Sequence, residues 1–406
     1  MGTVDKYVAE LNDGSAAGMI KNRLLQYCMT CGSQMIPNLA AATGYSIPTV
    51  AKYLNELKTD GFIIEQGKIT SARGRKPSLY GVNPDACYFI GVDIKQFMLL
   101  IAQMNLMGEI VRNKKVGDFN FENTPSVMDA ICYEILHFID EEGIDRNSIM
   151  MVNVNISGRV DSKNGYSHSI FNFEDNDAPL ADILSEKTGC RVMIENDTRA
   201  MTYGEYMSGE VKGYKQVLFV NVSWGIGLGI VMDGKLYYGK DGYCGEFGHM
   251  KVYDNGVMCH CGKKGCLETE ISGRAIHRKL LERINAGESS ILASKVRDKE
   301  TITMADITIA ADRGDMLCIE LIEQMGAELG LQLANMINIF NPGIVIIGGT
   351  LACAGDYLLS PIRQAIRKYS LKLMNQDIVI ALSSLPDNAG VIGACMIARH
   401  RVFALV

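Results

Sequence analysis

The chain has 406 residues, 48% of them hydrophobic and 21% charged, a composition typical of a globular protein with two or three domains. No run of about 18 apolar residues occurs, and the start lacks a charged segment ahead of an apolar core, so we expect neither membrane insertion nor secretion. The 12 cysteines are too dilute for a disulfide scaffold, which predicts a cytoplasmic protein with reduced thiols.

Charge is distributed unevenly along the chain. The net charge is −6, yet residues 1–80 carry nine Lys and Arg against six Asp and Glu. This head therefore has a charge of +3, and the remainder carries −9. A basic head on an acidic body favours contact of the head alone with a polyanion.

The pattern of the first 82 residues predicts a winged helix-turn-helix. Residues 19–32 have apolar side chains at helical spacing, and a short helix follows that ends at Gly44. A longer helix then runs from the favourable N-cap Ser46 to Gly61. Two short strands with a basic loop between them come next. Three helices and a two-stranded wing are typical of a DNA-binding domain, which we place at residues 1–82.

The predicted recognition helix and wing offer polar groups to DNA. The helix carries hydroxyl and ammonium groups near its start, where they reach phosphates or base edges in the major groove. The arginines of the wing loop would follow a minor groove. The alternative is a helical interaction domain with a solvated basic loop. The predicted DNA-binding residues are Ser46, Thr49, Lys52, Arg73, Arg75 and Lys76.

The body contains one structural unit twice. Residues 87–113 and 215–239 each predict a buried strand, a tight turn, a second strand, a turn and a third strand, followed by helices. This duplication predicts an α/β protein with a two-lobed, actin-like (ribonuclease H-like) sugar kinase fold. We expect a first lobe at 83–200 and a second lobe at 201–406, with the option that the C-terminal helix returns to the first lobe.

In such a fold the two hairpin turns hold nucleotide phosphates from opposite sides. Gly225-x-Gly227-x-Gly229 is by itself more typical of a glycine-punctuated β-hairpin than of a phosphate loop, but its place in the repeated unit adds weight to the phosphate loop. A later helix, buried strand and turn at Gly348-Gly349 resemble the adenosine-binding end of the second lobe.

Asp197 is the candidate base. A strand over residues 191–195 ends in Asn196-Asp197, where a helix begins. A carboxylate at that point is held rigidly beside a cleft and can accept a proton from a sugar hydroxyl. An aspartate before a helix is equally typical of a helix cap, and both interpretations stay open.

Cysteines cluster in the second lobe. Cys259-x-Cys261-x₄-Cys266 supplies three thiolates and His249 a nitrogen, which together are the four ligands of a tetrahedral structural zinc. His260 competes with His249, but in an extended chain its flanking cysteines would aim it away. Four protein ligands leave no position for a metal-bound water, which argues against hydrolysis. The alternative is a set of buried free thiols.

These motifs resemble the ROK family (repressors, open reading frames and kinases) over residues 85–406. The similarity lies in G-E-x-G-H at 245–249, C-x-C-G-x-x-G-C-x-E at 259–268, S-G-R-V-D at 157–161 and E-N-D at 195–197. The resemblance implies that Asp197 is the base in kinase members and that His249 touches both zinc and sugar. The sugar-binding residues that it implies are Gly158, Arg159, Asn196, Asp197, Glu246, His249 and Glu268.

The chain departs from the kinases of this family in both phosphate loops. The first loop keeps Asp93 but replaces the small residues after it, although its Lys95 can attract a phosphate. In the second loop a bulky Trp224 stands directly before Gly225. These two departures lead us to expect that neither ATP nor magnesium binds. The cofactor that we do expect is the structural zinc of the cysteine cluster. The residues of the degenerate phosphate loops are Asp93, Gly225, Gly227, Gly348 and Gly349.

Together these features predict a sugar-responsive DNA-binding regulator, a repressor of carbohydrate metabolism genes. A sugar, amino sugar or sugar phosphate would bind in the cleft, and lobe closure would change operator affinity. Paired half-sites predict a homodimer or homotetramer on operator DNA. The alternative is an ATP-dependent hexose or N-acetylhexosamine kinase, similar to a glucokinase, with an accessory DNA-binding head.

Overall fold

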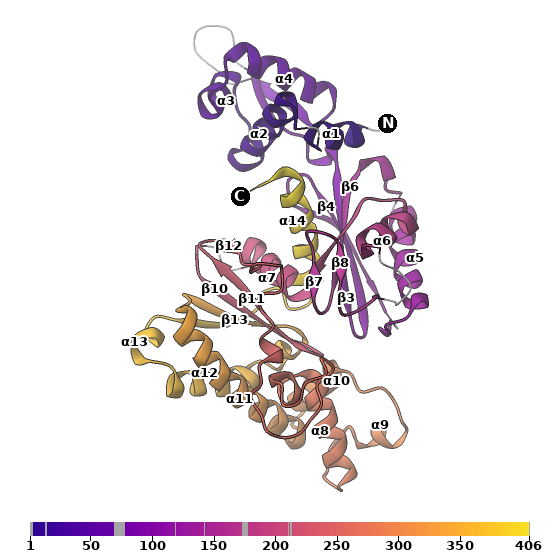
Figure 1. Ribbon diagram of the computed structural model, residues 1–406, viewed down its shortest axis with the longest axis vertical. Coiled ribbons are helices and arrows are strands. Elements are labelled where there is room, and N and C mark those ends of the chain that lie inside the picture. The colour runs from indigo at the N-terminus through magenta and orange to yellow at the C-terminus, as the bar shows by residue number, and fades with distance from the viewer. Residues whose placement is uncertain are drawn as a thin grey trace.

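The computed structural model describes every residue except 1, 2, 13, 69–77, 118, 142, 173–177, 210, 212 and 406. A helical head lies at one end of an elongated molecule, and two α/β lobes follow it along the long axis (Figure 1). The last helix of the chain returns to the head, so both termini lie near that end (Figure 1). Within the described ranges, no helix is long and apolar enough to cross a membrane.

The head has the predicted three helices and two antiparallel strands, preceded by a helix, α1, that the sequence did not predict. Val50, Leu54 and Leu57 form the buried face of α4, and Ser46 caps its start by accepting a hydrogen bond from the Thr49 N–H. The elements of the head are α1 (Thr3–Asn12), α2 (Ala16–Cys31), α3 (Ile36–Thr43), α4 (Ile47–Thr59), β1 (Ile63–Lys68) and β2 (Ser78–Val82).

A buried lysine joins α1 to the rest of the head. The side chain of Lys21 is only 3% exposed, and its Nζ lies 2.7 Å from Glu10 of α1 and 3.1 Å from Glu56 of α4. Burial acts to lower the pKa of Lys21, but the two carboxylates outweigh it and raise that pKa above its ordinary value. The helix that the sequence missed is therefore part of the head's core.

The first lobe is a five-stranded mixed sheet in the order β5-β4-β3-β6-β9. Helices α5 and α6 cover one face, and α14 packs on the other against β3, β6 and β4 (Figure 1). A two-stranded ribbon, β7 with β8, lies beside it. The bounds are β3 (Tyr88–Lys95), β4 (Met98–Asn105), β5 (Ile110–Val116), α5 (Pro125–Glu141), β6 (Ile149–Ile156), β7 (Val160–Asp161), β8 (Tyr166–Ser167), α6 (Leu180–Thr188) and β9 (Val192–Asn196).

The second lobe repeats this plan with a sheet in the order β12-β11-β10-β13-β14. Its main core lies between the sheet and the helices α8, α10, α11 and α12. The predicted duplication and the two-lobed fold are thus confirmed. From the β9–α7 junction to the end of the chain, and including the helix α14 that packs on the first lobe, the bounds are α7 (Asp197–Ser208), β10 (Val217–Val222), β11 (Ile226–Met232), β12 (Lys235–Leu236), α8 (Gly273–Asn285), α9 (Ala293–Arg297), α10 (Met304–Asp312), α11 (Met316–Phe340), β13 (Ile344–Gly348), α12 (Asp356–Tyr369), α13 (Lys372–Asn375), β14 (Val379–Leu382) and α14 (Ala389–Phe403).

Helices α7 and α14 cross at very short range between the two sheets. A Cβ added at Gly393 of α14 would lie 1.8 Å from the carbonyl oxygen of Ala200, and one at Gly204 of α7 would lie 2.0 Å from that of Ala389. Only glycines permit this approach. The predicted lobe boundary at residue 200 falls inside α7, which also contacts β10 and β11, and the division into domains stays a prediction.

Gly393→Ala should destabilise the protein by about 1–3 kcal/mol, because the added methyl forces the two helices apart. Gly117→Ala is the matched control, since nothing lies within 4 Å of a Cβ at that position, and its effect should stay within about 0.5 kcal/mol. Urea unfolding of both variants measures the difference. Equal stabilities would contradict the close crossing.

Candidate functional site

A cavity of about 470 Å³ lies between the two lobes, within the range of about 300–1,000 Å³ that is usual for small-molecule sites. The segments that line it include the β3–β4 turn, the loop after β6, the junction of β9 with α7, the β10–β11 turn, the cysteine-bearing loop and the start of α10. Polar and apolar side chains therefore converge from both lobes.

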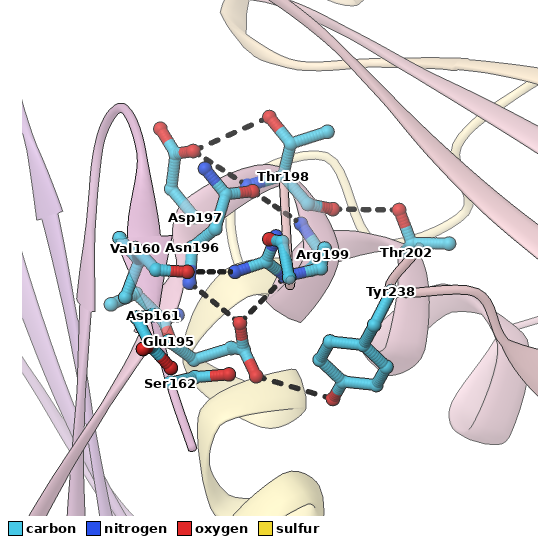
Figure 2. Close-up of polar contacts among 12 residues, drawn as sticks. Val160, Asp161, Ser162, Glu195, Asn196, Asp197, Thr198, Arg199, Thr202 and Tyr238 are labelled. Atoms are coloured by element: carbon cyan, nitrogen blue, oxygen red, sulfur yellow. Dashed lines mark hydrogen bonds and ion pairs between the residues drawn. The ribbon is translucent and has the colours of Figure 1, made fainter. Parts of the chain in front are cut away.

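The β9–α7 junction places Asn196 and Asp197 in the cavity wall. Asn196 is the N-cap of α7, since its Oδ1 accepts a hydrogen bond from the Arg199 N–H at 3.0 Å, and its Nδ2 donates to the Gly158 carbonyl at 3.0 Å. The Asp197 carboxylate is thus not needed as the cap. It accepts a hydrogen bond from the Ser157 hydroxyl at 2.7 Å. It also accepts one from the Thr198 N–H at 2.6 Å (Figure 2).

The enclosure of Asp197 changes its acidity. Burial raises the pKa of this carboxyl above its ordinary value, and the hydrogen bond from Ser157 only partly opposes that effect. A carboxylate whose proton affinity is raised in a cleft can bind a sugar hydroxyl strongly, and in a kinase it can accept the proton of that hydroxyl. The geometry suits both uses.

Behind Asp197 lies an ionic cluster around Glu195, whose side chain is fully buried. One carboxylate oxygen of Glu195 lies 2.7 Å from Nε of Arg199, and the other lies 2.8 Å from Arg401 of α14. The Tyr238 hydroxyl donates to the same carboxylate at 3.2 Å (Figure 2). No sequence pattern indicates this role, because Glu195 directly precedes Asn196 and Asp197 in the chain but bonds to Arg401, 206 residues away.

The cysteine loop has the geometry of a tetrahedral metal site. Donor atoms of His249, Cys259, Cys261 and Cys266 all lie within 4.8 Å of one another. Cys261 Sγ lies 3.7 Å from Cys266 Sγ, and Cys259 Sγ lies 3.6 Å from His249 Nδ1. A tetrahedron with metal–sulfur bonds of about 2.3 Å has edges of about 3.8 Å. The soft donor set and its spacing therefore fit zinc.

His249 faces the cavity with its other ring nitrogen. Its Nε2 lies 3.6 Å from a carboxylate oxygen of Glu246, and both side chains line the cavity. A metal bound at Nδ1 would fix the ring and with it the direction of Nε2.

His260 also lines the cavity, contrary to the expectation that it would point away. The chain is not extended there but turns, with the Gly262 N–H donating to the Cys259 carbonyl at 2.9 Å. His260 Nδ1 lies 2.8 Å from a carboxylate oxygen of Glu268 and 3.9 Å from Cys259 Sγ. Burial acts to raise the pKa of Glu268, but the imidazole of His260 holds it below its ordinary value. Glu268 is therefore an ionised acceptor in the cavity.

Groups that a phosphate would need in the two loops are already engaged. Lys95 donates to the Asp387 carbonyl at 2.9 Å and lies 4.0 Å from the buried Asp93 carboxylate. In the second loop, the Ser223 N–H donates to the Gly225 carbonyl at 3.0 Å, and the Ser223 hydroxyl accepts from the Thr350 N–H at 3.2 Å. The Lys95 ammonium and the Ser223 and Thr350 N–H groups therefore already have hydrogen-bond partners within the protein.

The glycines of these loops have a packing role. A Cβ at Gly227 would lie 2.3 Å from Thr198 Oγ1, and one at Gly229 would lie 1.7 Å from Thr202 Oγ1, so these glycines let α7 lie against β11. Gly225 and Gly227 line the cavity. Gly348 instead packs against the Phe219 ring, and Gly349 has φ +87°.

Arg159 stands apart from the other predicted sugar-binding residues. Its guanidinium donates to the His168 carbonyl at 3.1 Å and to the Ser169 hydroxyl at 3.3 Å, and it does not belong to the cavity wall. The other six line the cavity: Gly158, Asn196, Asp197, Glu246, His249 and Glu268.

The head presents the start of α4 to solvent, on the side away from the lobes (Figure 1). Ser46 and Lys52 are exposed, and the Ser46 hydroxyl lies 2.7 Å from that of the half-buried Thr49. Arg73, Arg75 and Lys76 lie outside the described residues.

A family model for the ROK family matches residues 89–401. The chain belongs to the ROK family. A xylose repressor from Caldicellulosiruptor bescii is 29% identical, over 85% of this chain and 86% of its own. A glucokinase from Thermotoga maritima is 33% identical, over 77% of this chain and 98% of its own.

Structural similarity extends over the head as well as the ROK region. The crystal structure of a ROK family transcriptional regulator, a homologue of the E. coli Mlc protein, has a TM-score of 0.76 and 28% identity, with 98% of both chains covered. The glucokinase covers only 315 residues of this chain, about the length of the ROK match. The full architecture is thus similar to that of the regulator.

Cys261→Ser should remove about one zinc per chain, lower the melting temperature of the body by about 5–10 °C and abolish sugar binding, because it removes a ligand that fixes the loop between Glu246 and Glu268. Cys31→Ser, an exposed cysteine of the head, is the control and should change none of these. Metal analysis, thermal unfolding and calorimetry measure the three effects. Normal sugar binding by a zinc-free variant would contradict the role of the metal.

Proposed function

We propose that this protein is a sugar-responsive transcriptional repressor whose effector binds in the cavity between the lobes. The main support for this proposal is that one chain contains both a winged helix-turn-helix head and a cleft of the sugar-binding type. The cleft is lined by Asp197, Glu246, His249 and Glu268. The full-length similarity to a xylose repressor and to a ROK regulator supports this function.

The finer assignments belong to the same proposal. Residues 1–82 bind operator DNA, 83–200 and 201–406 form the two lobes, and α14 belongs to the first lobe by its contacts. Zinc is structural, held by His249 and the three clustered cysteines. The protein acts in the cytoplasm as a homodimer or homotetramer, because a palindromic operator is read by paired heads. The effector is a sugar, an amino sugar or a sugar phosphate.

The kinase alternative keeps one observation in its favour, the enclosed carboxylate of Asp197. In both phosphate loops, groups that could bind a phosphate are hydrogen-bonded within the protein, and this favours an effector pocket instead. ADP release in the presence of ATP and a sugar panel, lost in Asp197→Asn, would establish the kinase.

Helix α14 connects the cavity to the head. At its start, Gly390 lies directly against Asp93 of the first loop, where an added Cβ would be 2.3 Å from the carboxylate. Asn155 fixes this contact, since its Nδ2 donates to Asp93 at 3.1 Å and to the Gly390 carbonyl at 2.8 Å. The helix has 15 residues and is therefore about 22 Å long.

At its other end α14 is bonded to the head. The side-chain amides of Asn22 and Gln26 of α2 both donate to the Phe403 carbonyl, and the Phe403 ring lies 5.8 Å from that of Tyr7 in α1. Arg401, two residues earlier, forms the ion pair with Glu195. A rigid helix thus contacts the cleft and the head at once, and a shift of the β9–α7 junction on sugar binding would move the head.

Gln26→Ala should uncouple the two sites, because it removes side-chain hydrogen bonds to the end of α14. We expect unchanged sugar affinity, while the sugar-induced change in operator affinity, typically 5- to 150-fold in allosteric proteins, falls toward one. Gln376→Ala, on the exposed surface of the second lobe, is the control. Fluorescence anisotropy with and without sugar measures the change. A full sugar response in Gln26→Ala would exclude this route.

Two further variants should separate DNA binding from sugar sensing. Lys52→Ala should weaken binding to DNA from upstream of the protein's own gene and reduce the salt slope by about one, because a phosphate contact is lost. Asp197→Asn should keep DNA binding and lose the sugar response. Lys58→Ala is the control on the same helix, since Lys58 is paired with Glu65 at 3.1 Å. If the native protein bound neither this DNA nor any sugar, the proposed function would be wrong.

A further inference from the structure

An aromatic pair occupies the place between the two loops where a kinase holds phosphates. Phe97 of the β3–β4 turn and Trp224 of the β10–β11 turn meet edge to face, with ring centroids 5.5 Å apart and an interplanar angle of 82°. Both rings are half-buried and line the same cavity as Asp197 and Glu268. The two lobes therefore contribute one ring each to a shared apolar surface.

The backbone around each ring is fixed by hydrogen bonds within the protein. Gln96 exchanges two bonds with Phe121, its side-chain amide donating to the Phe121 carbonyl at 3.1 Å and its own carbonyl accepting from the Phe121 N–H at 2.8 Å. The Trp224 carbonyl accepts from the Arg274 N–H at 3.0 Å. The turns that carry the rings are thus ordered before a ligand arrives, which lowers the entropic cost of binding.

The aromatic pair is adjacent to the carboxylate end of the cavity. Gly225 follows Trp224 directly, and a Cβ at Gly225 would lie 3.1 Å from a carboxylate oxygen of Glu268. A ligand held by Asp197 and Glu268 that extends toward the turns therefore meets the rings next.

The chemistry of this end favours a second sugar ring over a phosphate. The Ser223 and Thr350 N–H groups already have hydrogen-bond partners. The Lys95 ammonium is also engaged, since it donates to the Asp387 carbonyl and lies 4.0 Å from the Asp93 carboxyl. One face of a pyranose carries C–H bonds and packs on an aromatic ring, while its hydroxyls stay at the edge for hydrogen bonds. Within the described residues none accepts a hydrogen bond from the Trp224 indole N–H, which leaves it available to a hydroxyl.

We propose that Phe97 and Trp224 form a second saccharide subsite, so that the effector is a disaccharide or longer oligosaccharide. Its first ring binds at Asp197 and Glu268, and its second ring packs on the aromatic pair. This inference rests on the proposed function, since it specifies the effector class of the same cavity.

Trp224 is the only tryptophan of the chain, so its fluorescence reports on the subsite directly. The zinc-loaded, full-length protein is titrated with glucose, xylose and N-acetylglucosamine and with the β-1,4-linked disaccharide of each, by calorimetry and by tryptophan emission. At least one disaccharide should bind about three- to tenfold more tightly than its monosaccharide and shift the emission to shorter wavelength. The monosaccharide should bind without that shift.

Phe97→Ala should abolish the preference for the disaccharide and leave monosaccharide affinity within twofold. Trp224→Phe, followed by calorimetry, should keep part of the preference, because it retains an aromatic face. Tyr133→Ala, an exposed aromatic on α5, is the control and should behave as the native protein. The melting temperature of each variant verifies that it is folded.

The outcomes separate this inference from the proposed function. Sugar binding with no preference for disaccharides, or a preference that survives Phe97→Ala, overturns the subsite but leaves the sugar-responsive repressor intact. ATP or glucose 6-phosphate could instead shift the emission of the native protein and leave that of Phe97→Ala unchanged. That result would assign the two rings to a phosphorylated ligand and would also overturn the saccharide subsite. Absence of binding by every saccharide overturns both.

Discussion

The buried carboxylate of Glu195 is the interaction on which the arrangement of this molecule depends. It lies at the end of β9, bonds to Arg199 of α7 on one side and to Arg401 of α14 on the other, and is fully enclosed. Removing one partner of such a cluster leaves a buried charge uncompensated, which is strongly destabilising. The strand end that presents Asn196 and Asp197 is therefore fixed relative to the helix that reaches the head.

The same region shows why a glycine pattern that is typical of phosphate loops has a packing role in this chain. Gly227 and Gly229 keep the spacing of a phosphate loop, but they are needed because α7 packs against β11 through Thr198 and Thr202. The loops themselves are closed by internal hydrogen bonds and by an aromatic contact between the lobes. Packing of α7 against β11 thus accounts for these glycines, and several donors of the two loops have partners within the protein.

Much of the architecture followed from the sequence because its signals are local. Helix caps and glycine ends located the helices of the head, and the repeated strand–turn–strand pattern located both sheets. The missed helix α1 is short, and it depends on the buried Lys21 contacting Glu10 and Glu56, which lie 11 residues before and 35 residues after it. Such a contact leaves no periodic signal.

The sequence by itself determined the residue types and spacing that indicate a winged head, a two-lobed body and a cluster of cysteines with the spacing of a metal site, because each signal is a local pattern and the body contains its pattern twice. Only the tertiary structure decided which groups meet: that Asn196 rather than Asp197 caps α7, that His260 turns into the cavity, that Arg159 stays outside it, and that Phe97 and Trp224 come together. The contact of the two rings joins turns that are far apart in the chain and lie in different lobes. The other three features depend on the local backbone geometry, which residue spacing alone does not determine.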